Sequence, residues 1–224
     1  NVEYRWRNIK QTALATMYDL LAKHRANMIG QVREKSDLID VVRELFGEDS
    51  GSLNARELAE GWRKTAEYLR RRFNAAGGAI GKLEDWGLPH SHDALRVGSV
   101  SKEQWIGELV PALDRSRMID DATALPMDDK RLTEVLGEVY DTIVSEGWTK
   151  RNPGAGGTGA TGNRRAEHRF LHFASADDWL AYNERYGGAT PLDAMMGHVE
   201  YMSRDIAMME ILGPNPAATI RWMK

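Results

Sequence analysis

Cysteine is absent from this chain of 224 residues, which excludes disulfide bonds and thiolate metal sites. A reducing compartment or a virus particle suits such a composition. Apolar runs all fall short of the roughly 20 residues that a membrane-spanning helix needs. A surplus of one charge is lacking too, because 30 basic residues face 33 acidic ones and leave a formal net charge of −3. Nothing global therefore steers the chain toward nucleic acid or an anionic membrane.

The start of the chain carries no methionine, and we expect no signal peptide there. It begins at Asn1, and the residues up to Lys10 are charged and fit a helix. We therefore expect a soluble piece cut from a longer protein. Hydrophobic residues make up 42% of the chain, enough for a buried core, which argues against wholesale disorder.

Apolar residues recur at steps of three and four along most of the chain, as on one face of an α-helix. The first such stripe runs from Trp6 to Leu21 and predicts a helix over about Glu3 to Asn27. Capping residues and helix-ending glycines mark further starts and stops. Other helices are predicted over residues 37–46, from 52 or 54 to 76, after 101, over 126–145, 176–186 and 191–213, and from 217.

Very little of the chain resembles a strand. His168 to Phe173 is compact, aromatic and followed by a helix cap, which favours a strand there. Residues 81–99 are punctuated by glycine and proline and are predicted to be irregular. The predicted fold class is therefore mainly α: a multi-helix, bundle-like domain with at most one short strand or extended segment.

A glycine-rich stretch divides the predicted helices. Gly154 to Gly159 matches the dinucleotide-binding pattern G-x-G-x-x-G, but that motif needs a preceding strand and a following helix, and neither is predicted here. A flexible linker is the better interpretation. The expected organisation is an N-terminal helical region (1–147), a glycine-rich flexible loop (148–163) and a C-terminal helical region (164–224) that packs on the first.

Histidines near an aspartate are the first candidates for chemistry. His90, His92 and Asp93 lie in one predicted loop, and His168 and His172 would share one face of a strand. Two histidines and a carboxylate can hold zinc or iron. The competing interpretation is ordinary polar contacts or helix capping, since no His-Glu-x-x-His helix supports a metal. We predict no catalytic residue, no cofactor and no metal, and keep these five as the candidate ligands.

Charged clusters have similarly plain alternatives. Asp120-Asp121, Asp128-Asp129 and Asp177-Asp178 could serve acid–base chemistry, but each adjoins a helix start, where carboxylates are stabilising anyway. Basic clusters could contact nucleic acid, or form solvated and salt-bridged helix faces. The basic residues in question are Arg70, Arg71, Arg72, Arg164, Arg165 and Arg169.

A stripe rich in methionine follows the last long helix at steps of four and three, the spacing of a coiled-coil seam. Methionine fills irregular gaps in cores and also suits adaptable interfaces. The stripe is therefore either a plain core face or an interface with a partner helix. Its members are Met195, Val199, Met202, Ile206 and Met209.

Several blocks between Leu88 and Pro216 resemble segments of large phage and prophage proteins. The longest are Arg169-Phe-Leu-His-Phe-Ala-Ser-Ala-Asp-Asp-Trp-Leu-Ala-Tyr182 and Arg204-Asp-Ile-Ala-Met-Met-Glu-Ile-Leu-Gly-Pro-Asn-Pro216. Shorter ones are Leu88-Pro-His-Ser-His-Asp93, Leu113-Asp-Arg-Ser-Arg117 and Asp193-Ala-Met-Met-Gly-His198. The resemblance is to internal virion or minor structural proteins and implies a virion component, ejected with the DNA or packed near the portal.

The resulting expectation is a non-catalytic, α-helical assembly domain of a bacteriophage virion structural protein, an internal protein linked to DNA ejection. Its partners would be other virion proteins or further copies of itself, with a weak DNA contact as an additional possibility. It would reside in the virion, and in the host cytoplasm before assembly. Two alternatives stay open: a metal-dependent enzyme domain that uses the His/Asp loop, and a nucleic-acid-binding module.

Overall fold

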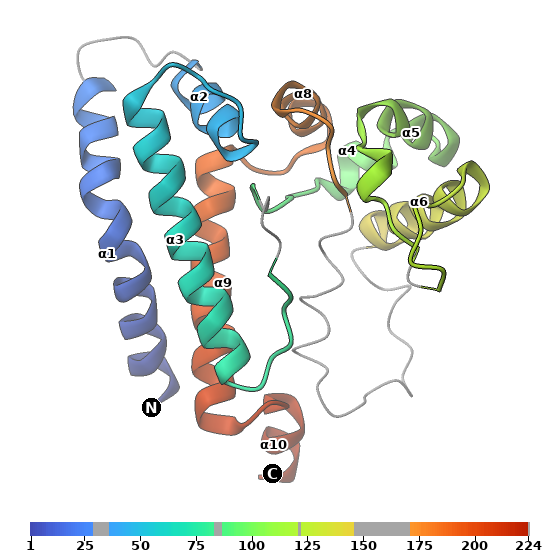
Figure 1. Ribbon diagram of the computed structural model, residues 1–224. Coiled ribbons are helices and arrows are strands. Elements are labelled where there is room, and N and C mark those ends of the chain that lie inside the picture. Colours follow the sequence, from blue (N-terminus) through green and yellow to red (C-terminus); the bar gives the residue numbers. More distant parts are fainter. Residues whose placement is uncertain (29–35, 83–86, 121, 146–170, 224) are drawn as a thin grey trace. The chain divides into compact units, whose positions relative to one another are not determined.

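The computed structural model describes residues 1–28, 36–82, 87–120, 122–145 and 171–223 (Figure 1). The chain is mainly α-helical there, as its periodicity predicts. Of the helices described, none combines the length and the low charge that a bilayer span requires. The residues fall into two compact units, which we call unit 1 and unit 2. Unit 1 draws on Asn1–Pro89 and Pro191–Lys224, and unit 2 on His90–Gly156 and Arg169–Thr190.

This division differs from the predicted one. Both units take residues from each side of the glycine-rich stretch 148–163, which itself lies outside the described residues. The regions 1–147 and 164–224 are therefore not the units in which the chain packs. The physical reason is that the last long helix buries its apolar stripe against the N-terminal helices of unit 1.

Unit 1 is built around three long helices that lie side by side (Figure 1). Ion pairs show the directions of the helices. Arg5 of the first helix pairs with Glu210 of the last, and Lys10 pairs with Glu200, so these two helices run antiparallel. Arg72 of the middle helix also meets Glu210. The helices of unit 1 are α1 (Val2–Met28), α2 (Ser36–Leu45), α3 (Leu53–Ala75), α9 (Pro191–Leu212) and α10 (Pro216–Trp222).

The core of unit 1 consists of stripes that the helical period aligns. On α1 the buried stripe includes Ile9, Ala13 and Met17, and on α3 it includes Trp62 and Leu69, each exposing at most 2% of its surface. Burying one large apolar side chain stabilises the fold by about 1.5–3 kcal/mol. Each long helix repeats such burial over several turns, so packing along the stripes holds unit 1 together.

Unit 2 contains shorter helices, most of which begin with a capping side chain. The hydroxyl of Ser101 accepts from the amide of Gln104, and that of Ser175 from the amide of Asp178. The elements of unit 2 are α4 (Ala94–Gly98), α5 (Lys102–Leu109), the 3₁₀ turns η1 (Val110–Ala112) and η2 (Arg115–Arg117), α6 (Asp129–Val144) and α8 (Ala176–Tyr186).

The middle of unit 2 is aromatic. Trp105 of α5 is fully buried, and its ring lies 5.8 Å from Tyr140 of α6 and 6.4 Å from Tyr182 of α8, measured between ring centroids. Tyr182 in turn contacts Phe173 and Tyr186. One tryptophan thus joins three helices, and offset or edge-on ring pairs add about 0.5–1.5 kcal/mol each beyond their burial.

Extended backbone within the described residues is limited to isolated one-residue bridges. Phe173 bridges Leu113 in antiparallel fashion, whereas Leu171 and His172 of the predicted strand have no regular secondary structure. Residues 168–170 of that predicted strand lie outside the described residues. The stretch 81–99 is not wholly irregular as predicted, because the side chain of Asp93 caps the short helix α4 there.

Candidate functional site

Sequence-predicted ligands and buried aromatics come together in unit 2, in what we call the histidine cluster: His90, His92, Phe173, Trp179 and Tyr182. The two histidines lie on the segment that leads into α4, and Phe173 lies on the segment that leads into α8. Trp179 and Tyr182 are three residues apart on α8, so they share one face of that helix. The cluster therefore depends on residues about 90 positions apart in the chain.

His90 uses both ring nitrogens within unit 2. The indole N–H of Trp179 donates to Nδ1 over 3.1 Å, so Nδ1 carries no proton. The proton of a neutral ring must then be on Nε2, which lies 3.0 Å from the carbonyl oxygen of Leu171 and donates to it. Burial lowers the pKa of His90 to about 4, which keeps the ring neutral at neutral pH. Neither nitrogen can bind a metal without breaking one of these bonds.

His92 lies beside His90 with its ring nearly parallel, the centroids being 6.2 Å apart. Its Nδ1 is 3.1 Å from the hydroxyl of Tyr182. Burial raises the pKa of Tyr182 well above its ordinary value, so the phenol keeps its proton and can donate it to the imidazole. His92 also forms a backbone bridge to Gly187 just after α8. The ring and the backbone of His92 thus both fasten the α4 segment to α8.

Asp93 is the N-cap of α4. Its Oδ1 accepts from the amides of Leu95 and Arg96 over 2.9 and 3.1 Å, and its Oδ2 lies 3.6 Å from Nε of Arg96. This is the capping alternative that the sequence left open. Both carboxylate oxygens are occupied locally, and the backbone amide of Asp93 donates to the carbonyl of Tyr186 over 2.9 Å.

The two remaining predicted ligands do not complete a site. His168 lies outside the described residues. The carbonyl of His172 accepts from the amide of Asp114 over 2.8 Å, and burial, together with Arg117, lowers the pKa of the His172 ring. Among the residues that the structure describes, no three His, Asp or Glu side chains are grouped closely enough to hold a metal ion.

The acidic pairs take part in caps and turns. Asp128 caps α6 by accepting from the amide of Arg131 over 2.7 Å, and Asp120 holds a turn through the amide of Ala122 over 2.7 Å. The second oxygen of Asp120 pairs with Nε of Arg131 at 3.0 Å. Ser175 donates to Asp178 as well as accepting from its amide. Asp121 lies outside the described residues.

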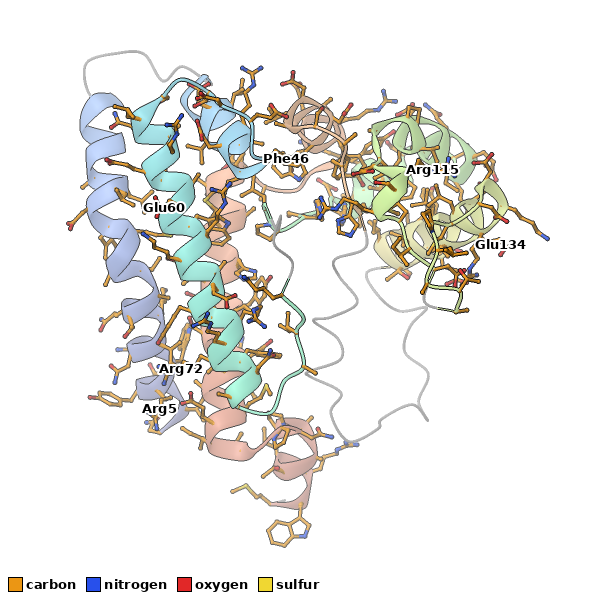
Figure 2. The ribbon with its side chains drawn as sticks, in the orientation of Figure 1. Arg5, Phe46, Glu60, Arg72, Arg115 and Glu134 are labelled. Carbon is orange, nitrogen blue, oxygen red and sulfur yellow. The ribbon has the colours of Figure 1, made fainter. Side chains whose placement is uncertain are left out.

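Arg70, Arg71 and Arg72 of α3 each pair with a carboxylate of unit 1. Arg70 and Arg71 both pair with Glu67 at 2.7 Å, and the bond from Arg70 contributes most to lowering the pKa of Glu67 to about 2. Arg72 pairs with Glu210 on α9. Figure 2 shows Arg5 and Arg72 at the end of α1 and α3 where Glu210 meets both. Paired in this way, the three arginines do not form one basic patch.

Three further arginines of the predicted basic clusters, Arg164, Arg165 and Arg169, lie outside the described residues, as does the glycine motif 154–159.

The methionine stripe of α9 is a core seam of unit 1. Its five members expose at most 2% of their surface each, and α9 packs against α1 and α3. Of the two alternatives given for the stripe, the core face describes how these side chains lie within unit 1. The stripe consists of Met195, Val199, Met202, Ile206 and Met209.

Sequence reasoning missed the polar residues that this core encloses. His198 of α9 is 4% exposed, its Nδ1 bonds with the hydroxyl of Tyr201, and its ring meets Trp62 edge-on. Thr65 of α3 donates to the carbonyl of Ala13 on α1 over 3.2 Å. The only signal in the sequence was the spacing of three between His198 and Tyr201, which places both on one helix face.

The chain was compared with protein families, curated proteins and solved structures. No protein-family model, curated protein or solved structure matches the chain.

Proposed function

We propose that this chain is a structural assembly domain of a bacteriophage virion protein, of the internal or ejected class. The observation that carries the proposal is that the polar residues discussed above form hydrogen bonds and ion pairs inside the fold. His90 and Asp93 bond partners within unit 2, and the arginines of α3 pair with carboxylates within unit 1. Such residues build a fold, whereas a catalytic group has to offer an atom to a substrate.

The energetics of the histidine cluster support the same role. A buried imidazole without partners would cost roughly 1–3 kcal/mol, so bonding both nitrogens of His90 removes a penalty. The bonds also fix the ring tautomer and join α8 to the segment before α4. A neutral, doubly bonded histidine suits a joint between elements better than it suits proton transfer near neutral pH.

The resemblance to internal virion proteins supplies the biological setting. Its C-terminal block, Arg204 to Pro216, covers the end of α9 and the start of α10. Gly213 there has a φ of +86°, which glycine adopts without strain, and Asn215 caps α10. The block therefore encodes a sharp joint between two helices, a structural feature in keeping with an assembly domain.

The proposal is tested on phage particles induced from the source strain and purified through a density gradient. Quantitative mass spectrometry should find peptides of this chain in a fixed ratio to the major capsid protein, before and after nuclease treatment and a high-salt wash. An abundant host cytosolic protein serves as the control and should be depleted by the same steps. Peptides that leave the particles when DNA ejection is triggered would identify the ejected class. Purified particles without the peptides would overturn the proposal.

A further inference from the structure

The outward face of α1 carries a row of six uncharged residues at steps of four and three. All six are exposed, with Tyr4 and Tyr18 leaving 71% and 54% of their surface uncovered. We call this row the α1 seam; it consists of Tyr4, Asn8, Gln11, Ala15, Tyr18 and Ala22. Each pair of successive steps, one of four and one of three, spans seven residues, which is the heptad repeat of a left-handed coiled coil.

The α1 seam is not the face through which α1 packs in the bundle of unit 1. The opposite side of α1, with Ile9, Ala13 and Met17, is the side buried against α3 and α9. Isolated exposed tyrosines are ordinary on a protein surface. A continuous uncharged row over 18 residues, about 27 Å of helix, is a different matter. The packing of the described residues of unit 1 does not require it.

A matched comparison is available within unit 1. The outward face of α3 is charged at the same steps of three and four, and it carries the i,i+4 ion pairs Lys64–Glu60 and Arg71–Glu67. That face is an ordinary solvated helix surface. The two long helices share one bundle, yet only α1 combines coiled-coil spacing with uncharged residues on its exposed side.

We propose that α1 pairs through this seam with α1 of a second copy of the chain, antiparallel and about a two-fold axis. The proposal rests on the assembly role proposed above, for which it names a partner. In an antiparallel pair, seam positions whose numbers sum to 26 meet. Along the edge formed by Arg5, Thr12 and Asp19, positions whose numbers sum to 24 lie opposite each other. Each layer then combines a larger residue with a smaller one, so the two seams are complementary in shape. The layers are Tyr4 with Ala22, Tyr18 with Asn8, and Gln11 with Ala15.

Charge complementarity selects the same register. Arg5 and Asp19 flank one edge of the seam, and antiparallel pairing brings Arg5 of each copy opposite Asp19 of the other. A parallel pair would place each of these residues against the other edge of the partner's seam, and would not bring Arg5 and Asp19 together. Arg5 also pairs with Glu210 of its own chain at 3.2 Å, but its side chain stays 52% exposed and a guanidinium has five N–H donors. It can therefore serve both carboxylates.

The first experiment measures mass against concentration by sedimentation equilibrium, from about 1 µM to about 1 mM. The 25.2 kDa chain should approach twice that mass as concentration rises. Ala15→Glu places a charge in the seam and should weaken the dimer at least tenfold. The matched control is Ala181→Glu, the same change at an exposed alanine within α8, which should leave the dimer unchanged. Gln11→Glu, nearly identical in shape to the native residue, should weaken the dimer even where Ala15→Glu disturbs folding.

The second experiment reads the orientation and uses the absence of native cysteine. In the antiparallel register Thr12 lies opposite Thr12 of the second copy, whereas Tyr4 lies far from its counterpart. A short bismaleimide should therefore join Thr12→Cys into covalent dimers and leave Tyr4→Cys largely monomeric. Ala181→Cys measures random collisional cross-linking.

The outcomes separate the two proposals. A chain that stays monomeric throughout the concentration range, or a dimer indifferent to both seam substitutions, overturns pairing through α1. Efficient cross-linking of Tyr4→Cys but not Thr12→Cys overturns the antiparallel register. None of these results removes the chain from virions, which the particle analysis judges separately. Conversely, a dimer with the expected pattern stands even if the particles lack the protein.

Discussion

Unit 1 and unit 2 are both helical, but their helices differ in length and in how they are held. The three main helices of unit 1 have 27, 23 and 22 residues, and their stripes bury aliphatic side chains and methionines over many turns. The helices of unit 2 have 5, 8, 16 and 11 residues and surround an aromatic centre. Stripe packing thus dominates unit 1, and individually specified contacts dominate unit 2.

The difference follows from the ends of helices. Every helix leaves four amides and four carbonyls without partners inside it, whatever its length. A short helix therefore bears the same end penalty with fewer turns of packing to offset it. All four α-helices described in unit 2 have a side chain that accepts from a first-turn amide, supplied by Asp93, Ser101, Asp128 and Ser175. The long helix α3 also has a cap, Ser52, but its buried stripe offsets the penalty of its ends over more turns.

The largest expected effect comes from opening a cavity in one unit at a time. Leu136→Ala in α6 and Met202→Ala in α9 each remove a side chain that is at most 2% exposed, so each should lower the free energy of unfolding of its unit by about 2–5 kcal/mol. Native-state hydrogen exchange, read helix by helix, measures both. Leu136→Ala should weaken protection in unit 2, and Met202→Ala in unit 1. Equal loss throughout the chain would mean that the units unfold as one.

Mild acid should act on unit 2 through His90. The unfolded imidazole binds a proton near its ordinary pKa of 6.5, whereas the folded one does so only near 4. Stability is therefore complete above pH 6.5 and falls as the pH drops toward 4, by about 2 kcal/mol at pH 5. The lowered pKa of His172 acts in the same direction. Urea unfolding at several pH values measures the loss.

His90→Gln is the control for this pH effect, because glutamine can keep a donor and an acceptor but does not titrate. Its stability should change less between pH 7 and pH 5 than that of the native chain; an identical dependence would contradict the assignment to His90. In unit 1, Glu67 becomes protonated in a lower pH range than His90 does. The pKa of Glu67 is lowered to about 2, so its contribution is lost only as the pH falls from 4.5 toward 2.

Loss of a cap should cost about 1 kcal/mol and reveal the difference in helix length. Ser175→Ala leaves a first-turn amide of the 11-residue helix α8 without its partner, and Ser52→Ala does the same to the 23-residue helix α3. Hydrogen exchange should show lost protection along most of α8 but only in the first turn of α3. Ser175→Asp restores an acceptor and should recover most of the stability. Similar fraying in both helices would argue against the role assigned to length.

The smallest expected effect is an increase in the free energy of unfolding. Ala124 adopts a φ of +56° in the turn before α6, a conformation that costs an L-residue roughly 1–2 kcal/mol. Ala124→Gly removes this strain but loses about 0.5–1 kcal/mol to backbone entropy, so a net stabilisation of about 0.5 kcal/mol is expected. Chemical denaturation measures the change. Ala122→Gly in the same turn is the control and should destabilise instead.

Local patterns in the sequence predicted the helices well. The helices predicted to start at 52 or 54, after 101 and at 176 begin after the capping side chains Ser52, Ser101 and Ser175, and α8 has the predicted bounds of Ala176–Tyr186. Apolar spacing and capping are properties of neighbouring residues, so a single sequence reveals them. The missed element is α4, whose five residues are too few for a helical period to register.

The sequence by itself determined where the long helices run and which faces they bury, because the helical period and the capping residues act over a few positions. Only the tertiary structure decided which helices share a unit and what the singled-out residues do. Arg72 meets Glu210 across 138 positions, and His90 meets Trp179 across 89. Such contacts depend on how whole helices pack in space, and the amino-acid types alone left His90 free to be either a metal ligand or a joint between helices.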